Sequence, residues 1–165
     1  MSQTLVVHPL TQPATDARKA RAATAYLVRR THAAPAVIMA LRYLADRQHL
    51  MLYGSFIAHD TYLAGPEGPQ PAPCACPQIG PLDVQTLLSL SDFDCLNAMV
   101  AQWEHLGSDA ICHQAKDAAW GCARLNASLL DRPIIALEAI VAQVDEDGTL
   151  AAHLRHRHPG EAVPA

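Results

Sequence analysis

The side chains best suited to gripping another molecule lie close together in one helical stretch of the chain. Arg42, Asp46 and His49 are spaced three and four residues apart, which places side chains on one face of a helix. Tyr43 and Arg47 lie beside this stripe. Arginine makes bidentate hydrogen bonds that lysine does not, and tyrosine and arginine are frequent anchors of protein interfaces. The stretch is therefore a candidate surface for contact with a partner.

An internal polar network is the alternative interpretation of this stretch. In that arrangement Asp46 holds Arg42 or the segment around Asp60 and Tyr62. Charged helix faces are usually only solvated unless aromatic residues join them. The residue types and their spacing fit the contact surface and the internal network equally well.

His59 and Asp60, with Tyr62 close by, have the residue types of an acid-base pair, because an imidazole near a carboxylate is tuned to move protons near neutral pH. Adjacent residues on an extended segment point in opposite directions, however. The sequence therefore favours a structural role, in which Asp60 caps a turn or pairs with an arginine of the helix.

The five cysteines are an odd number and are scattered along the chain, which disfavours a disulfide framework. Cys74 and Cys76, with Cys112-His113 and Cys122 later in the chain, suggest a zinc site but lack paired CxxC spacing. Cys112 and His113 also diverge by about 100° on a helix, so they do not make a nucleophile and base. We expect no metal ion.

The motifs of common enzyme classes are absent from the sequence. There is no glycine-rich phosphate loop, no GxSxG and no HExxH. The sequence therefore predicts no catalytic residues, no cofactor and no enzymatic activity.

The two tryptophans have different sequence surroundings. Trp103 follows an apolar helical stripe, as a core residue does, whereas Trp120 stands between alanines and a glycine. Trp120 is predicted either to pack over a surface of small residues or to insert into a partner.

The elements that must position these residues are mostly helices. Apolar residues recur at helical spacing, and the half of the chain that is apolar is rich in alanine. Thr15 or Asp16 and Ser91 are the predicted N-caps of two helices. Predicted helices cover 15–31, 35–51, 92–106, 109–116, 118–130 and 133–144, with a last turn or two in 149–158.

The expected fold is mainly α, a single compact multi-helix domain with a small two-stranded or extended β element near residues 55–64. We expect a flexible N-terminal arm over 1–14, a helical domain over 15–148 with a proline-rich loop at 65–81, and a short helix with a disordered tail over 149–165.

Charge is distributed unevenly along a chain whose net charge is only −4. Residues 1–50 carry seven Lys and Arg against two Asp, whereas the remainder carries five against fourteen acidic residues. A basic helix with Arg18, Lys19, Arg21, Arg29 and Arg30 could track DNA phosphates, but the acidic remainder would repel nucleic acid. No transmembrane segment or secretory signal is evident, so we expect a cytoplasmic protein.

The sequence from Leu41 to Leu50, followed by Tyr53-Gly54, by Ile57 to Ala64 and by a Gly-Pro turn, resembles the N-terminal signature of one family. That family is the SocA-like, or Panacea, antitoxin-associated domain. Later segments are also similar to this family, at 91–107, 108–120 and 133–141, so the resemblance covers most of 35–144. The chain departs from the family pattern at 70–81 and at Lys116.

This resemblance implies a largely helical bacterial or phage domain without enzymatic activity, commonly encoded beside a toxin that it neutralises by direct contact. The expected partner is thus a protein toxin encoded by a neighbouring gene, and the alternative is a DNA-binding regulator that uses the basic N-terminal helix. The expected contacts include the proline-rich loop and a set of seven side chains. These are Arg42, Tyr43, Asp46, Arg47, Asp60, Tyr62 and Trp120.

Overall fold

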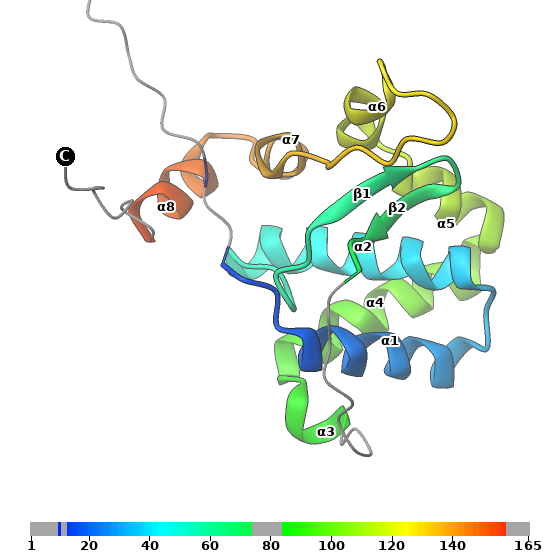
Figure 1. The fold of residues 1–165 in the computed structure, drawn as a ribbon. Coiled ribbons are helices and arrows are strands. Elements are labelled where there is room, and N and C mark those ends of the chain that lie inside the picture. Colours follow the sequence, from blue (N-terminus) through cyan, green and yellow to red (C-terminus); the bar gives the residue numbers. More distant parts are fainter. Residues whose placement is uncertain (1–9, 11–12, 74–83, 158–165) are drawn as a thin grey trace, which may run out of the picture.

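Helix α2 (Pro35–Tyr53) runs through the middle of the molecule in the computed structural model, which describes residues 10, 13–73 and 84–157 (Figure 1). Pro35 suits the first turn because its fixed φ is helical and its missing N–H has no partner there. Gly54 ends the helix in the left-handed conformation, at φ 69°. Apolar residues on both sides of α2 are buried, including Ile38, Leu41 and Leu50, so this helix is the centre of the core.

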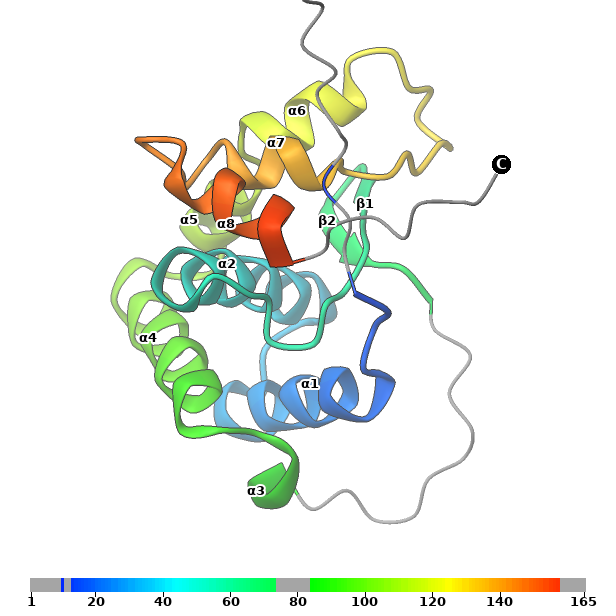
Figure 2. The same cartoon turned by 90° about the vertical axis from the view of Figure 1, so that its left-hand side faces the viewer.

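Helices α1 (Ala17–Thr31) and α4 (Leu90–Leu106) pack on one side of α2, with the short helix α3 (Val84–Leu87) beside α1 (Figure 2). Asp16 caps α1 as predicted, accepting hydrogen bonds from the backbone of Arg18 and Lys19. The predicted cap of α4 is wrong by two residues. Ser89 rather than Ser91 is the N-cap, and it forms a capping box with Asp92.

The only β structure within the described residues, apart from one isolated bridge, is an antiparallel hairpin of β1 (Tyr62–Gly65) and β2 (Gly68–Pro71). The predicted extended element at 55–64 overlaps only β1. The strand that pairs with β1 lies further along the chain, at residues 68–71. Residues 68–71, expected to belong to a loop, form β2 instead. Pro69 and Pro71 are tolerated because they stand opposite Ala64 and Tyr62, at positions where β1 and β2 exchange no hydrogen bonds.

Residues 108–157 cover the other side of α2. They contain α5 (Ser108–Ala115), α6 (Ala118–Arg124), α7 (Leu137–Val141) and α8 (Thr149–Arg157). Helix α6 ends six residues before the predicted end at Leu130. Helix α7 begins at Leu137 rather than Pro133, because residues 133–135 lie extended beside β1.

The expected fold class is confirmed: the domain is mainly helical with one small two-stranded sheet. Most of the predicted N-terminal arm, residues 74–81 of the predicted loop and the predicted tail from 158 lie outside the described residues. Among the helices that the structure describes, none is both long and apolar enough to cross a membrane.

Candidate functional site

A buried network of charged and phenolic side chains joins α2 to the segment before and into β1. Arg42 of α2 pairs with Asp60, and both side chains are almost fully buried. Asp46, one turn further along α2, accepts a 2.8 Å hydrogen bond from the backbone N–H of Ile57 and a 2.5 Å bond from the hydroxyl of Tyr62. Two adjacent turns of one helix therefore fix the path of residues 57–62.

Burial raises the pKa values of Asp46 and Tyr62 in this network. Desolvation raises the pKa of Asp46 to about 6, although the hydrogen bonds from Tyr62 and Ile57 and the charge of Arg42 oppose the shift. Desolvation and the neighbouring Asp46 also hold the pKa of the Tyr62 phenol well above its usual value. Tyr62 thus remains a protonated donor at any physiological pH.

Asp117 links α2 to the start of α6. Its Oδ1 accepts from the backbone of Trp120 and caps α6, while its Oδ2 accepts from the Tyr43 hydroxyl at 2.8 Å and from Arg47 at 2.9 Å. Desolvation and Asp117 raise the pKa of Tyr43. Tyr43 and Tyr62 meet edge to face at 5.0 Å, so the two networks are continuous.

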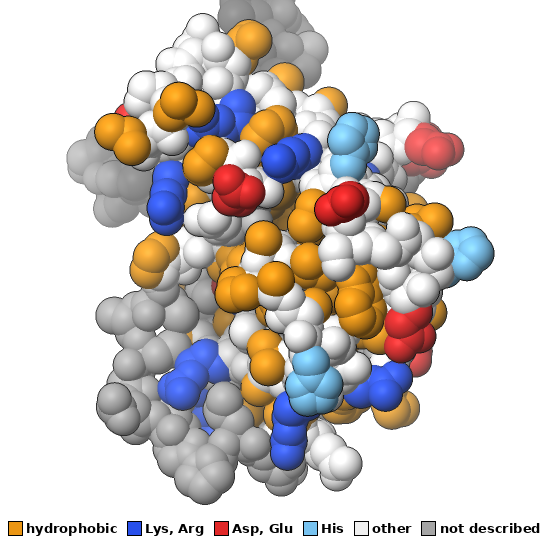
Figure 3. Space-filling view, turned by 90° about the vertical axis from the view of Figure 1, so that its right-hand side faces the viewer, with side chains coloured by type: hydrophobic (Ala, Val, Ile, Leu, Met, Phe, Trp, Pro, Cys, Tyr) orange, Lys and Arg blue, Asp and Glu red, His pale blue; other side chains and the backbone are white. Residues whose placement is uncertain are grey.

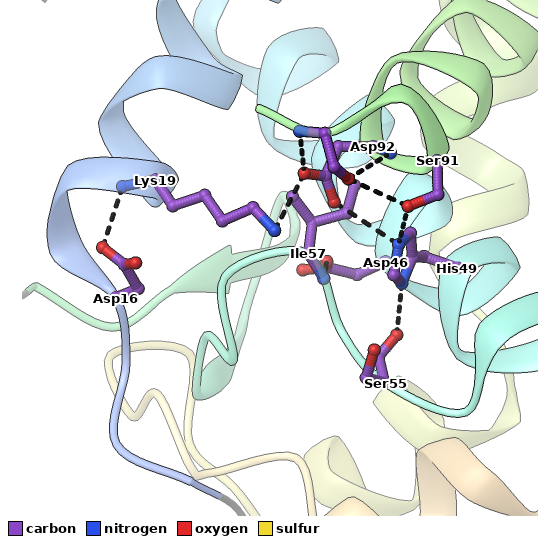
Figure 4. Close-up of polar contacts among 9 residues, drawn as sticks. Asp16, Lys19, Asp46, His49, Ser55, Ile57, Ser91 and Asp92 are labelled. Atoms are coloured by element: carbon purple, nitrogen blue, oxygen red, sulfur yellow. Dashed lines mark hydrogen bonds and ion pairs between the residues drawn. The ribbon is translucent and has the colours of Figure 1, made fainter. Parts of the chain in front are cut away.

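A third cluster joins α1, α2 and α4 around the fully buried carboxylate of Asp92 (Figure 4). Asp92 pairs with Lys19 at 2.8 Å and accepts a 2.7 Å bond from the backbone N–H of Ser89. His49 Nδ1 faces the carbonyl of Ser55 at 2.5 Å, so this nitrogen carries the proton.

The same cluster places the hydroxyl of Ser91 3.2 Å from His49 Nε2, a distance that a nucleophile and a general base require. The carboxylate of Asp92 lies 3.4 Å from this same nitrogen, whereas in a catalytic triad the acid holds the opposite ring nitrogen. The imidazole is also buried. We therefore interpret the cluster as a structural junction between helices.

The structure places five of the seven predicted contact residues inside the protein. These are Arg42, Tyr43, Asp46, Asp60 and Tyr62. The expectation that they face outward is wrong, because residues 57–65, strand β2 and helix α5 pack against α2, and Asp117 contacts it from the start of α6. The alternative is confirmed: Asp46 holds the segment around Tyr62, and Asp60 pairs with Arg42 of the helix.

The remaining two predicted contact residues, Arg47 and Trp120, are partly exposed. The indole N–H of Trp120 donates a 2.9 Å bond to the carbonyl of Gly65, and Lys116 lies over its ring at 5.7 Å. Trp120 therefore anchors α6 on the tip of the hairpin while one part of its ring stays accessible.

Residues 125–134 form a loop that presents large apolar side chains to solvent. The exposed fractions are 80% for Leu125, 79% for Leu129, 94% for Leu130 and 64% for Ile134. Exposed apolar side chains are visible in the upper part of Figure 3. Large exposed apolar patches mark interaction surfaces, and these four apolar side chains lie within ten residues of one loop.

This loop, which we call the leucine loop, is held in place by Arg124. The guanidinium donates to the carbonyls of Ala64, Ser128 and Asp131 at 3.3, 3.0 and 2.6 Å. The carboxylate of Asp131 accepts from the backbone N–H of Ser128 at 2.9 Å, and this bond lowers its pKa. The leucines are therefore displayed on a fixed backbone.

The two edges of the small sheet differ. The outward positions of β2 are Pro69 and Pro71, which have no N–H to offer another strand. On the other side, Ala64 donates to the Pro133 carbonyl and Ile135 donates to the Tyr62 carbonyl, both at 2.8 Å. In this antiparallel pattern the backbone N–H and C=O of Ile134, opposite Leu63, point away from β1. The edge beside the leucine loop is thus open.

The basic face of α1 is the remaining charged feature. Arg18, Arg21 and Arg29 are exposed and fall on one side of the helix, whereas Lys19 pairs with Asp92. Three histidine, cysteine or acidic side chains that could share a metal ion are not found together in the described part of the chain. Cys74 and Cys76 lie outside that part.

Sequence reasoning missed Arg124, Asp117 and the leucine loop. The sequence predicts that Leu125, Leu129 and Leu130 belong to a helix, which in fact ends at Arg124. Asp117 is the N-cap of α6, and nothing in the sequence connects it to Tyr43 and Arg47.

No family model, no curated protein and no solved structure matches this chain.

Proposed function

We propose that this protein binds a protein toxin encoded by a neighbouring gene and neutralises it by direct contact through the leucine loop. The observation that carries the proposal is the set of exposed apolar side chains, Leu125, Leu129, Leu130 and Ile134, on a loop fixed by Arg124. The resemblance of residues 41–64 to antitoxin-associated domains supplies the class of partner.

The leucine loop leaves large apolar side chains in water. Leucine side chains that remain in water contribute nothing to the core, whereas burying each against a partner stabilises a complex by about 1.5–3 kcal/mol. A loop already fixed by hydrogen bonds loses little conformational entropy on binding, so more of that free energy appears as affinity. The arrangement therefore favours protein binding.

The open edge at Ile134 adds a polar component to the same surface. An extended segment of the toxin would pair with the outward N–H and C=O of Ile134 while its apolar side chains cover Leu129 and Leu130. Neutralisation would then be steric, because the bound segment is withheld from the toxin's own target. We place both proteins in the cytoplasm.

The buried residues support this surface from within. Tyr62 and Ala64 hold residues 133–135, and Asp46 and Asp60 fix the chain leading to Tyr62. Arg47 and Trp120 are partly accessible, and direct contact of either with the toxin stays a prediction.

The test is co-expression with the product of each neighbouring gene, followed by purification through a tag on that product. We expect a stable complex with one neighbour, whose affinity falls at least tenfold when Leu129 and Leu130 are both changed to Ser. Leu90→Ser is the matched control, because Leu90 is 84% exposed at the start of α4, away from the loop. If the double variant binds this gene product as tightly as the unaltered protein does, the leucine loop is not the contact surface.

The exposed arginines of α1 support DNA binding as a second candidate function. Arg18, Arg21 and Arg29 could contact successive phosphates along one groove. This candidate predicts binding that weakens steeply with salt and that Arg21→Gln with Arg29→Gln reduces. Fluorescence anisotropy with duplex DNA at low salt decides it, since absence of binding there eliminates this function.

A further inference from the structure

Prolines occupy different kinds of position at the two edges of the small sheet. On β2, Pro69 and Pro71 stand at the outward-facing positions, so this edge presents no N–H there. On the segment 133–135 the proline faces inward, because its carbonyl accepts from Ala64, and the outward-facing residue is Ile134. Of the described residues, this segment therefore gives the sheet its one edge that can both donate and accept hydrogen bonds.

The edge formed by residues 133–135 is exposed. In Figure 2 no other coloured element lies to the right of this segment, which borders β1. The side chain of Ile134 is 64% exposed. An edge whose outward-facing residue is neither charged nor a proline lacks the usual protection against pairing with another strand. The segment is thus a place at which a second extended strand can dock.

A second copy of the same segment is complementary to this edge. In an antiparallel ladder, two residues of a hydrogen-bonded pair exchange both N–H···O=C bonds. If Ile134 faces Ile134 of a second copy across a two-fold axis, each N–H donates to the other carbonyl. The two isoleucine side chains then lie beside each other on the same face of the joined sheet. Ile134 alone therefore supplies a donor, an acceptor and an apolar contact to its own copy.

The residues that flank Ile134 are complementary as well. In this antiparallel register, residues before position 134 in one copy lie opposite residues after position 134 in the other. The leucine loop of each copy, with Leu129 and Leu130, is then directed toward the start of α7 in the other copy. Arg132 and Glu138 are both exposed, and the register brings the arginine of one copy toward the carboxylate of the other. The charges that approach each other thus have opposite signs.

We propose that this protein forms a two-fold symmetric dimer in which residues 133–135 of two copies pair as antiparallel strands. The two hairpins and the two paired segments then make one continuous sheet. Because prolines close the β2 edge, association ends at two copies and does not continue into a fibre. The interface is small, so we expect a dissociation constant on the order of 10–100 µM.

The dimer uses the same edge at Ile134 that the toxin segment is proposed to use. The toxin and the second copy would therefore exclude each other, and the dimer would shield the leucine loop from water when no toxin is present. This exclusion rests on the proposed function. The dimer itself does not, and it is tested on the protein alone, so that either proposal can fail while the other stands.

Sedimentation equilibrium of the full-length protein between about 1 and 500 µM measures the association directly. We expect the average mass to rise with concentration from that of one chain toward that of two chains, and no further. A protein that stays monomeric over this range would overturn the proposal, and so would continued growth into larger assemblies. This measurement requires no substitution.

Substitutions of Ile134 test the geometry, because a residue on the two-fold axis faces its own copy. Ile134→Lys and Ile134→Glu each place two like charges opposite each other, and each should weaken the dimer at least tenfold. An equimolar mixture of the two variants pairs Lys with Glu and should associate at least tenfold more tightly than either variant alone. Leu90→Lys is the control, since Leu90 is 84% exposed at the start of α4, and it should leave the dimer unchanged.

Circular dichroism and thermal unfolding establish that each variant is folded before its mass is measured. If Ile134→Lys dimerises as tightly as the unaltered protein does, the two copies associate through another surface and the proposal is wrong. It is also wrong if the mixture of the two folded variants associates no more tightly than each variant does by itself.

Discussion

Arg124 supplies the hydrogen bond that Pro133 cannot. In the ladder between β1 and residues 133–135, the carbonyl of Ala64 faces position 133, where a proline has no N–H. The guanidinium of Arg124 occupies that place at 3.3 Å and uses its remaining donors on Ser128 and Asp131. One side chain thus connects the small sheet to the loop that carries the exposed leucines.

Replacing Arg124 by Ala should loosen the leucine loop. Three carbonyls lose their donor, so we expect unfolding to become easier by about 1–3 kcal/mol and amide hydrogen exchange to accelerate over residues 125–135. Hydrogen exchange with mass spectrometry measures the second effect. Arg132→Ala is the control, because Arg132 is exposed within the same loop, and it should change stability by less than about 0.5 kcal/mol. Unchanged exchange in Arg124→Ala would show that the loop does not depend on this side chain.

Removing the hydroxyl of Tyr62 should destabilise the fold. In Tyr62→Phe the buried carboxylate of Asp46 loses the donor that lies 2.5 Å away, and we expect a loss of about 1–3 kcal/mol in urea unfolding. Tyr53→Phe is the matched control, since Tyr53 is exposed at the end of α2, and it should be nearly neutral. Equal effects of the two substitutions would contradict the network described for Asp46.

Asp46 should make stability depend on pH in an unusual direction for a carboxylate. Its pKa in the folded protein is about 6, above the ordinary value of 3.8, so folding favours the protonated form. The stabilisation is complete below about pH 4 and is lost as pH rises through 6. Relative to Asp46→Asn, which does not titrate, the unaltered protein should therefore lose on the order of 3 kcal/mol as pH rises from well below 3.8 to well above 6. Urea unfolding of both proteins across this range gives the difference. A difference that grows in favour of the unaltered protein as pH rises would refute the assigned direction.

Helix α2 could be predicted from the sequence because its signals are local. Pro35, Gly54 and the apolar period between them act within the helix itself. The start of α4 could not be predicted, because Ser89 and Ser91 are both candidate N-caps and each is followed three residues later by an aspartate. Tertiary packing decides between them: Asp92 is buried against Lys19 of α1, which a local pattern does not show.

The grouping of the polar residues was also predictable, whereas their exposure was not. Helical spacing brought Arg42 and Asp46 together, and the internal pairing of Asp60 with a helix arginine was anticipated. Which face of α2 is covered depends on residues far along the chain, such as Asp117, and on the hairpin. The leucine loop escaped prediction because leucine has a high helix propensity, so the end of α6 at Arg124 had no local signal.

If the leucine loop captures a toxin, the growth of cells that express the neighbouring toxin depends on the leucines of this loop. The cells would carry the unaltered protein, the Leu129→Asp/Leu130→Asp double variant, or Leu90→Asp as control, each checked for equal folded amounts. We predict that the unaltered protein and Leu90→Asp restore growth and that the double variant does not. Full rescue by the double variant, at the same amount of folded protein, would contradict the claim.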